Sequence, residues 1–311
     1  MKHYKDLRIV FMGTPEFAVA SLDALVKAGC NIVGVITAPD KPAGRGMKLT
    51  ESAVKKYAKE IGLNILQPEK LKNSVFLEEL RALHADLQIV VAFRMLPEVV
   101  WNMTPMGTIN VHASLLPQYR GAAPINWVII NGEKETGVTT FKLKHEIDTG
   151  NILLQRKTLI GEDEIAGELH DRLKEIGAEL LVETAQGLAN GSLKEQAQPA
   201  NDSSEIKHAP KLFTENCEIL WDASAETIHN LIRGLSPYPG AFTFLQDKML
   251  KVFKSKKIIT SHKELPGTFS TDGKTYLRFA TTDGFIYLLD VQLQGKKKLM
   301  IEDFLRGYRF E

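Results

Sequence analysis

The chain of 311 residues contains little cysteine, no long hydrophobic run and no excess of charge of either sign. Its two cysteines, Cys30 and Cys217, are far apart with no cysteine nearby, which disfavours both a disulfide framework and a cysteine-rich zinc site. No run approaches the roughly 20 apolar residues that a membrane helix needs, and the first apolar run is too short for the core of a signal peptide. We therefore expect a cytoplasmic protein with no membrane partner.

Charge is balanced over the whole chain but not along it. The 39 basic and 38 acidic residues give a formal net charge of +1, which excludes binding of nucleic acid by bulk charge alone. Residues 1–206 carry 23 basic and 26 acidic groups, whereas residues 207–311 carry 16 basic and 12 acidic groups. Lysines gather at 251–257 and 296–298. They either form a nucleic-acid surface or protect strand edges from aggregation, and charge alone leaves both possibilities open.

The first two thirds of the chain alternate short apolar runs with amphipathic stretches. Strands are expected at residues 7–12, 31–36, 87–92, 108–112 and 139–143, and helices at 52–61, near 80–83 and at 166–187. Another helix is expected to start near residue 15, with Thr14 as its cap and Pro15 at its first position. Because the strands are almost continuously apolar, this alternation predicts an α/β domain with a mostly parallel sheet that is covered on both faces.

The composition changes near residue 196. A polar stretch without apolar periodicity begins there, and we expect a linker over residues 196–210. Beyond it, short β-branched and aromatic runs are separated by turn signals such as Asp272-Gly273, which predicts a small β barrel or sandwich. The expected organisation is a first domain over residues 1–195, the linker, and a β domain over residues 211–311.

The strongest candidate for chemistry is the sequence Asn-Val-His at the end of an expected strand. Asn110 and His112 are two positions apart, so their side chains point to the same face, at the edge where open α/β sheets bind ligands. An amide donor beside an imidazole suits the stabilisation of an oxyanion. A carboxylate such as Asp148, in the later Asp-Thr-Gly, would orient the imidazole and favour its charged form. The alternative is a structural pair that closes a strand, but the Leu-Leu-Pro that follows favours function.

Other patterns are weaker or exclude activities. The stretch 37–50 is too rich in proline and glycine to be regular, and its Lys41, Arg45 and Lys48 suit contact with phosphate or nucleic acid, with a plain surface loop as the alternative. The fingerprint Gly-x-Gly-x-x-Gly is absent, which disfavours a dehydrogenase. Ser114 lacks the context of a hydrolase nucleophile. The remaining histidines have no metal-ligand spacing, so no metal site is expected.

The sequence NVHASLLPQYRGAAP at 110–124 resembles the methionyl-tRNA formyltransferases, and the resemblance covers nearly the whole chain. It includes FMGTPEF at 11–17, DKPAGRG at 40–46, DTG at 148–150, PYPGAF at 237–242 and the GKKK that begins at Gly295. The Asn-His-Ser-Leu-Leu-Pro block and the aspartate are shared with folate-dependent formyltransferases in general. The arginine loop and the C-terminal domain indicate the tRNA enzymes.

The resemblance implies a Rossmann-like first domain and an OB-like β barrel that binds tRNA. It also implies transfer of a formyl group from 10-formyltetrahydrofolate to the α-amino group of charged initiator methionyl-tRNA in translation initiation, without a metal. The resemblance assigns catalysis to Asn110, His112 and Asp148. It assigns contact with folate to Ser114, Leu115, Leu116 and Pro117, and contact with tRNA to Arg45. We expect a monomer.

Two positions depart from the family's usual pattern. Arg94 and Glu146 stand where glycine is common, and both flank the expected pterin pocket. Two alternative functions stay open at this point. One is a folate-dependent formyltransferase for a nucleotide sugar or glycinamide ribonucleotide, against which the basic β domain and the arginine loop argue. The other is a non-catalytic RNA- or folate-binding protein, against which the complete set of Asn110, His112 and Asp148 argues.

Overall fold

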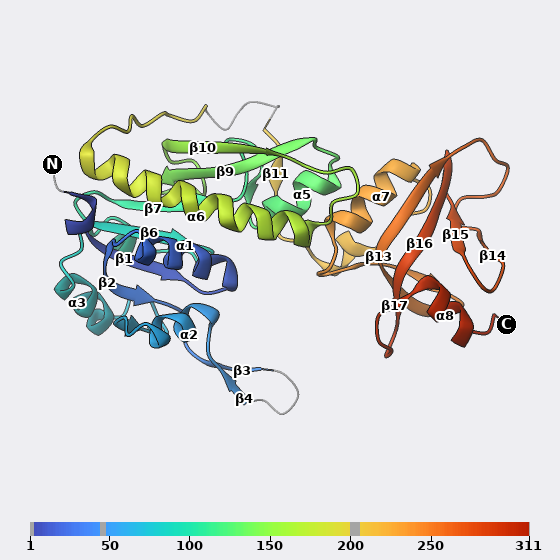
Figure 1. Cartoon of the computed structure of the whole chain (residues 1–311), viewed down its shortest axis with the longest axis horizontal. Helices are drawn as coiled ribbons and strands as arrows, with labels where there is room; N and C mark the ends of the chain where they lie inside the picture. Colours follow the sequence, from blue (N-terminus) through green and yellow to red (C-terminus); the bar gives the residue numbers. More distant parts are fainter. Residues whose placement is uncertain (1–2, 44–47, 200–205, 311) are drawn as a thin grey trace. The chain divides into compact units, whose positions relative to one another are not determined.

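A computed structural model describes residues 3–43, 48–199 and 206–310 (Figure 1). Arg45 lies outside the described residues. The helices are α1 (Glu16–Lys27), α2 (Ala53–Glu60), α3 (Ser74–Ala82), α4 (Glu98–Trp101), α5 (Pro124–Ile130), α6 (Ala166–Asn190), α7 (Ala225–Gly234) and α8 (Ile301–Gly307), with 3-10 turns η1 (Tyr4–Asp6) and η2 (Thr214–Cys217). Within the described ranges, no helix combines the length and apolar character needed to cross a membrane.

The strands follow the same chain order. They are β1 (Arg8–Gly13), β2 (Asn31–Ile36), β3 (Lys41–Ala43), β4 (Lys48–Thr50), β5 (Ile65–Leu66), β6 (Leu87–Val91), β7 (Thr108–His112), β8 (Arg120–Gly121), β9 (Glu135–Lys142), β10 (Ile152–Leu159), β11 (His208–Ala209), β12 (Ala241–Leu245), β13 (Lys248–Ile259), β14 (Phe269–Thr271), β15 (Leu277–Ala280), β16 (Gly284–Leu293) and β17 (Leu299–Met300).

A seven-stranded sheet forms the centre of the N-terminal part, in the order β10-β9-β7-β6-β1-β2-β5. The strands from β5 to β7 in this order run parallel, and β9 pairs with β7 in the antiparallel sense. This arrangement confirms the α/β class and the mostly parallel sheet predicted from the sequence. It leaves β7 inside the sheet, between β6 and β9.

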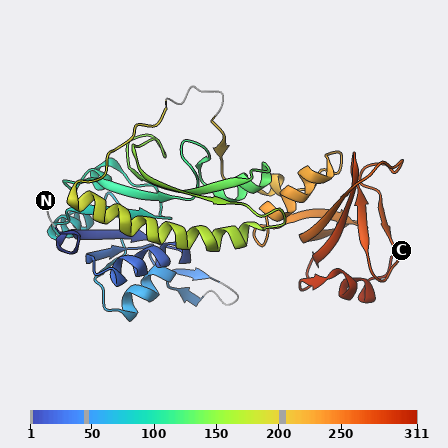
Figure 2. The ribbon, with the colours of Figure 1, turned by 45° about the horizontal axis from the view of Figure 1, so that its top comes forward.

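Both faces of this sheet are covered, because each strand turns alternate side chains to opposite sides. Val10 and Met12 of β1 pack into a cluster with apolar residues of α3 and α4. On the other face α6 runs along β7 and β9 (Figures 1 and 2). A Cβ atom added at Gly177 of α6 would lie 3.1 Å from Val111, so glycine allows the helix to approach this closely.

Local signals in the sequence explain several helix starts. Ser52 caps α2, since its hydroxyl accepts a hydrogen bond from the Lys55 amide at 3.0 Å. The start of α1 differs from our expectation. Its N-cap is Pro15 and no side chain caps it, so the predicted capping by Thr14 is wrong. Thr14 precedes the N-cap by one residue, which is too early for its hydroxyl to serve the first turn.

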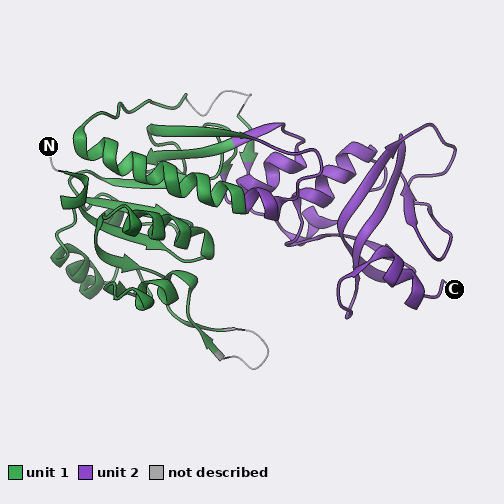
Figure 3. Ribbon diagram, in the orientation of Figure 1, with its two compact units in different colours: residues 1–120, 137–158, 171–208 green, residues 121–136, 159–170, 209–311 purple. Residues whose placement is uncertain are grey.

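The chain folds into two compact units that are not continuous in sequence (Figure 3). Unit 1 comprises residues 1–120, 137–158 and 171–208, and unit 2 comprises residues 121–136, 159–170 and 209–311. The two short segments of unit 2, residues 121–136 and 159–170, both form hydrogen bonds with residues of α7. Asn126 donates to the Gly234 carbonyl at 2.7 Å, and Arg233 donates to the Glu164 carbonyl at 3.2 Å. Residues 121–136 and 159–170 thus belong to unit 2, although they precede the expected linker at 196–210 in the sequence.

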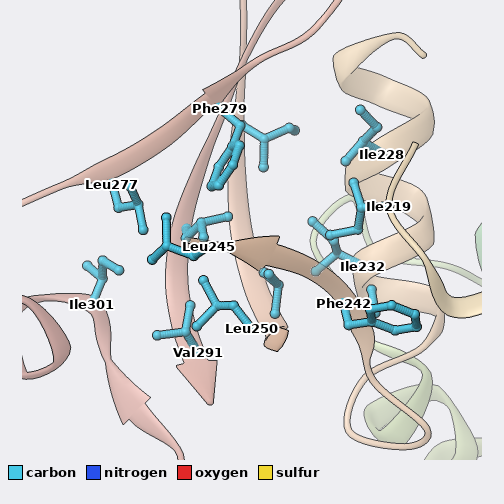
Figure 4. Packing of buried hydrophobic residues seen from close by; sticks show 14 of the residues in the cluster. Ile219, Ile228, Ile232, Phe242, Leu245, Leu250, Leu277, Phe279, Val291 and Ile301 are labelled. Carbon is cyan, nitrogen blue, oxygen red and sulfur yellow. The ribbon is translucent and has the colours of Figure 1, made fainter. Parts of the chain in front are cut away.

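Unit 2 contains an antiparallel sheet in the order β12-β13-β16-β15-β14, with β17 paired to β16 as well. Among the described strands β12 and β14 are the edges, so the curled sheet in Figure 2 is a half-barrel rather than a closed barrel. This confirms the small β domain. Its core joins Leu250 and Val291 of the sheet to Ile228 and Ile232 of α7 (Figure 4).

A buried histidine links α7 to other parts of unit 2. The Nδ1 atom of His229 lies 3.0 Å from the Ser255 hydroxyl, and Nε2 lies 3.2 Å from the Asp163 carboxylate. Burial, and after it the charge of Lys257, lowers the pKa of His229 below its ordinary value. The folded unit therefore favours the neutral imidazole.

This lowered pKa predicts a loss of local stability in acid. Between the folded pKa of His229 and its ordinary value of about 6.5, the unfolded chain binds more protons than the folded chain, so stability falls as pH falls through this window. The protection factors of α7 and β13 amides, which are corrected for the intrinsic pH dependence of exchange, should therefore fall between about pH 7.5 and about 5.5. The fall should be smaller in His229→Gln, and an equal fall in both proteins would contradict the prediction.

Candidate active site

Strand β7 presents an amide in an apolar setting. Asn110 pairs with Val90 of β6 on one side and with Phe141 of β9 on the other, and both neighbours are buried. Among the described residues, the buried Oδ1 atom of Asn110 finds no hydrogen-bond partner. A buried polar atom that lacks a partner costs about 1–3 kcal/mol. This oxygen is therefore suited to accept a hydrogen bond from a bound molecule.

A backbone carbonyl sets the orientation of His112. Its Nε2 atom lies 2.8 Å from the Tyr119 carbonyl oxygen. A carbonyl only accepts hydrogen bonds, so Nε2 must carry a proton. Nδ1 is then the nitrogen that exchanges a proton, and it lies 3.9 Å from the Asp148 carboxylate, too far for a hydrogen bond. The ring also meets Phe141 edge to face, with centroids 6.5 Å apart.

Asp148 reaches His112 from the loop between β9 and β10. The base of the loop is closed by the Lys142 amide, which donates to the Asn151 carbonyl at 3.0 Å. Asp148 has a φ of 55°, which is uncommon for a residue other than glycine. A Cβ atom added at Gly150 would lie 1.5 Å from the Lys142 carbonyl oxygen, so only glycine fits there. Loop geometry, not sequence spacing, brings the carboxylate to the imidazole.

Two residues that the sequence analysis did not single out hold this loop. The side-chain amide of Gln198 donates to the backbone carbonyls of Asp148 at 2.9 Å and Gly150 at 2.7 Å. Its Oε1 atom accepts from Nη2 of Arg120 at 2.6 Å. Burial lowers the pKa of the Arg120 guanidinium, and the charges of Asp148 and Glu146 oppose that lowering. Arg120 is part of the recognisable motif, whereas Gln198 lies in a polar stretch that carries no signal.

The segment assigned to folate contact forms a tight loop directly after β7. Ser114 is fully buried, and its hydroxyl donates to the Gln118 carbonyl at 2.6 Å. Leu116 is also buried. The side chains of Leu115 and Pro117 are only half-buried and are the ones in this segment that a ligand could contact. The assignment of all four residues to folate stays a prediction.

A cavity of about 670 Å³ lies at the carboxyl ends of β1, β2 and β6. Its walls are Thr14, Pro15, Ala38, Pro39, Asp40, Lys41, Glu69, Ala92, Phe93 and Arg94. It includes the point between β1 and β6 where the strand order reverses, which is the usual ligand site of open α/β sheets. Asn110 and His112 are not among its walls but belong to the neighbouring strand β7.

Two of the charged groups in these walls, Asp40 and Arg94, have partners. The hydrogen bond from Lys55, 2.6 Å long, is the main cause that lowers the pKa of Asp40. Arg94 donates from Nη1 to the Glu69 carbonyl at 2.8 Å and from Nη2 to the Pro68 carbonyl. Burial lowers the pKa of Arg94. The arginine therefore ties the segment after β5 to the segment after β6. Glu146, the other departure from the family pattern, is exposed in the Asp148 loop.

Comparisons with known proteins match this chain over nearly all of its length. The formyl transferase family model covers residues 7–185, and the model of the formyl transferase C-terminal domain covers residues 211–309. The methionyl-tRNA formyltransferase of Parabacteroides distasonis is 54% identical over 313 aligned positions, and the alignment covers 98% of this chain and 97% of the relative. The chain belongs to the methionyl-tRNA formyltransferase family. A further member, from Flavobacterium johnsoniae, is 52% identical over 310 residues and 98% of each chain. Membership makes the chain a formyltransferase.

Solved structures share the fold at lower identity. A sugar 3N-formyl transferase determined with dTDP and 5-N-formyl-THF has a TM-score of 0.67 and 23% identity, covering 94% of this chain and 99% of its own. HypX from Aquifex aeolicus in complex with tetrahydrofolic acid has a TM-score of 0.66 and 19% identity, covering 98% of this chain and 48% of its own. These similarities show a common formyltransferase fold.

The structure thus brings some of the predicted site residues together. It sets His112 beside Asp148 and puts Asn110 on the same face of β7, with the Ser114–Pro117 loop following directly. Arg45 cannot be located, because it lies outside the described ranges. In the part of the chain that the structure describes, no three His, Cys, Asp or Glu side chains gather as metal ligands. The predicted absence of a metal stays a prediction.

The tight approach at Gly150 predicts the effect of one added methyl group. In Gly150→Ala the loop must move away from the Lys142 carbonyl and carry Asp148 away from His112. Turnover should fall by about 10²-fold, since a displacement of about 1 Å at a reacting centre costs that much. Initial rates and circular dichroism would measure activity and folding. Gly307→Ala is the control, because a Cβ atom added at Gly307 has nothing within 4 Å. Unchanged turnover in Gly150→Ala would contradict the prediction.

Proposed function

We propose that the chain transfers the formyl group of 10-formyltetrahydrofolate to the α-amino group of initiator methionyl-tRNA. Identity above 50% to methionyl-tRNA formyltransferases over nearly their whole length supports this acceptor. The folates bound in structures of the same fold support the donor. The observation that carries the chemistry is the partnerless Oδ1 of Asn110 on the face where His112 turns Nδ1 toward Asp148.

The reaction begins when the neutral amine attacks the formyl carbon. An α-amino group has a pKa of about 8, so a useful fraction is neutral near pH 7. As the new C–N bond forms, the carbonyl π electrons move onto oxygen. Asn110 Nδ2 and a protonated His112 Nδ1 would donate to this oxyanion, and Asn110 Oδ1 would accept from an N–H of the attacking amine.

Collapse of the tetrahedral intermediate completes the transfer. The oxyanion re-forms the carbonyl, the bond to the folate nitrogen breaks, and the electron pair stays on that nitrogen. The amine loses one proton and the folate nitrogen gains one. Asp148 would keep His112 charged and, through water, move the proton between these two atoms.

The two substrates approach from different sides of β7 in this proposal. The donor would lie over the loop after β7, against Leu115 and Pro117. The acceptor end of the tRNA would lie over the side of the cavity formed by Thr14, Pro15 and Lys41, because Lys41 begins the β3–β4 ribbon, and the pterin would lie on the side of Arg94. The same ribbon leads into the loop that contains Arg45, for which a tRNA contact stays a prediction.

The function is tested by incubating the protein with 10-formyltetrahydrofolate and methionyl-tRNA, followed by analysis for formylmethionine. Formylmethionyl-tRNA should accumulate, while free methionine and an amino sugar linked to dTDP should stay unmodified. Formylation of the amino sugar without formylation of the tRNA would replace the proposal with a sugar formyltransferase. Failure to modify any amine would favour a binding protein.

The proposed mechanism predicts the effect of removing either oxyanion donor. Loss of one preorganised donor typically costs about 3–4 kcal/mol of barrier, so Asn110→Ala and His112→Ala should each lower kcat by about 10²–10³-fold. Rapid-quench measurement of formylmethionyl-tRNA at saturating substrates would determine kcat. Both variants should retain the wild-type circular dichroism spectrum. Near-normal turnover in both would remove these side chains from the mechanism.

A further inference from the structure

Gln198 uses its whole carboxamide to join two parts of unit 1. Its Nε2 atom donates to the carbonyls of Asp148 and Gly150, at 2.9 and 2.7 Å. Its Oε1 atom accepts from Nε and Nη2 of Arg120, at 3.1 and 2.6 Å. A primary amide has two N–H donors and two lone pairs on oxygen, and all four are occupied here.

The orientation of this carboxamide is fixed by its partners. If the amide were reversed, its oxygen would face two carbonyl oxygens and its NH₂ group would face a guanidinium that only donates. Arg120 is itself only 5% exposed, so its guanidinium is held inside the protein and stays beside Gln198. Gln198 is therefore held by Arg120 in the one orientation that fastens the loop of Asp148.

The loop that carries Asp148 has a strained backbone, so hydrogen bonds from outside the loop stabilise it. Asp148 has a φ of 55° in the left-handed region, where a residue with a side chain is less stable by about 1 kcal/mol or more. Its carboxylate stands 3.9 Å from His112 Nδ1 without a hydrogen bond between the two atoms. The backbone bonds from Gln198 act on the carbonyl of this same strained residue. They therefore hold the backbone from which its carboxylate projects.

We propose that Gln198, held by Arg120, is a positioning residue that keeps the Asp148 carboxylate directed at His112 during formyl transfer. The proposal deepens the function proposed above and rests on it for the role of Asp148. It also changes the meaning of residues 196–210. The expected linker contributes a side chain to the catalytic loop, and its Gln196 pairs through the backbone with Ile152, with N···O distances of 2.9 and 2.8 Å.

The first test compares two substitutions at Gln198 with a matched control. Gln198→Met removes all four bonds at similar length, and Gln198→Glu keeps the acceptor for Arg120 but loses both donors to the loop. Both should lower kcat by about 10–100-fold, as expected for a misplaced catalytic group, with KM for each substrate within about twofold of wild type. Gln196→Met alters an exposed side chain two positions away and should match wild type. Wild-type kcat in Gln198→Glu would overturn the proposal.

The second test asks whether Gln198 acts through Asp148. In the background Asp148→Asn, the carboxylate that needs directing is gone, so adding Gln198→Met should lower kcat further by less than about twofold. If Gln198 only stabilised the fold, the fold-decrease in kcat from Gln198→Met would multiply the fold-decrease from Asp148→Asn. Multiplicative losses would therefore overturn the proposal.

The third test does not depend on activity. Amide hydrogen exchange over residues 144–151 should be at least about tenfold faster in Gln198→Met than in wild type, and unchanged in Gln196→Met. If the wild-type protein failed to formylate methionyl-tRNA, the proposed function would be wrong. The exchange measurement would still test whether Gln198 holds the loop in place. Unchanged exchange in Gln198→Met would overturn the fastening even in an active formyltransferase.

Discussion

The chemistry of this site depends on one hydrogen bond, in which Nε2 of His112 donates to the carbonyl of Tyr119. It fixes the tautomer of the neutral ring and leaves Nδ1 facing Asp148. Tyr119 turns this carbonyl inward by adopting a φ of 59°, and its own amide is held by the Lys207 carbonyl at 2.6 Å. The hydrogen bond to its amide thus stabilises this strained residue, and its carbonyl orients the ring to which the proposed mechanism assigns a catalytic role.

The polar groups of the site work in surroundings that strengthen them. Asn110 stands between the buried side chains of Val90 and Phe141, so its amide interacts in a medium of low dielectric constant. The same surroundings make a partnerless Oδ1 unfavourable in the free protein. A substrate that supplies an N–H recovers that free energy, and preorganised dipoles of this kind provide much of the rate enhancement in comparable enzymes.

The sequence predicted the parts of the structure that follow from periodicity. Alternation along β7 was enough to put Asn110 and His112 on one face, and the apolar strands were enough to predict the parallel sheet. It could not predict how Asp148 returns to His112, because that depends on a loop that folds back over the sheet. Backbone groups carry no sequence signal, so the Tyr119 carbonyl was missed. Gln198 was missed because its bonds join positions 48 or more residues apart.

In the proposed arrangement, the walls of the cavity beside β7 would meet the uncharged methionyl group. Asp40 is paired with Lys55, and the guanidinium of Arg94 donates to two backbone carbonyls, so both groups already have partners within the protein. Because the methionyl side chain is apolar, a wall with unpaired charge would oppose its entry. Phosphate groups need the opposite, namely cations that are free to pair. Exposed Lys41, where the β3–β4 ribbon begins, suits that requirement, and the proposed arrangement puts the tRNA phosphates beside this lysine.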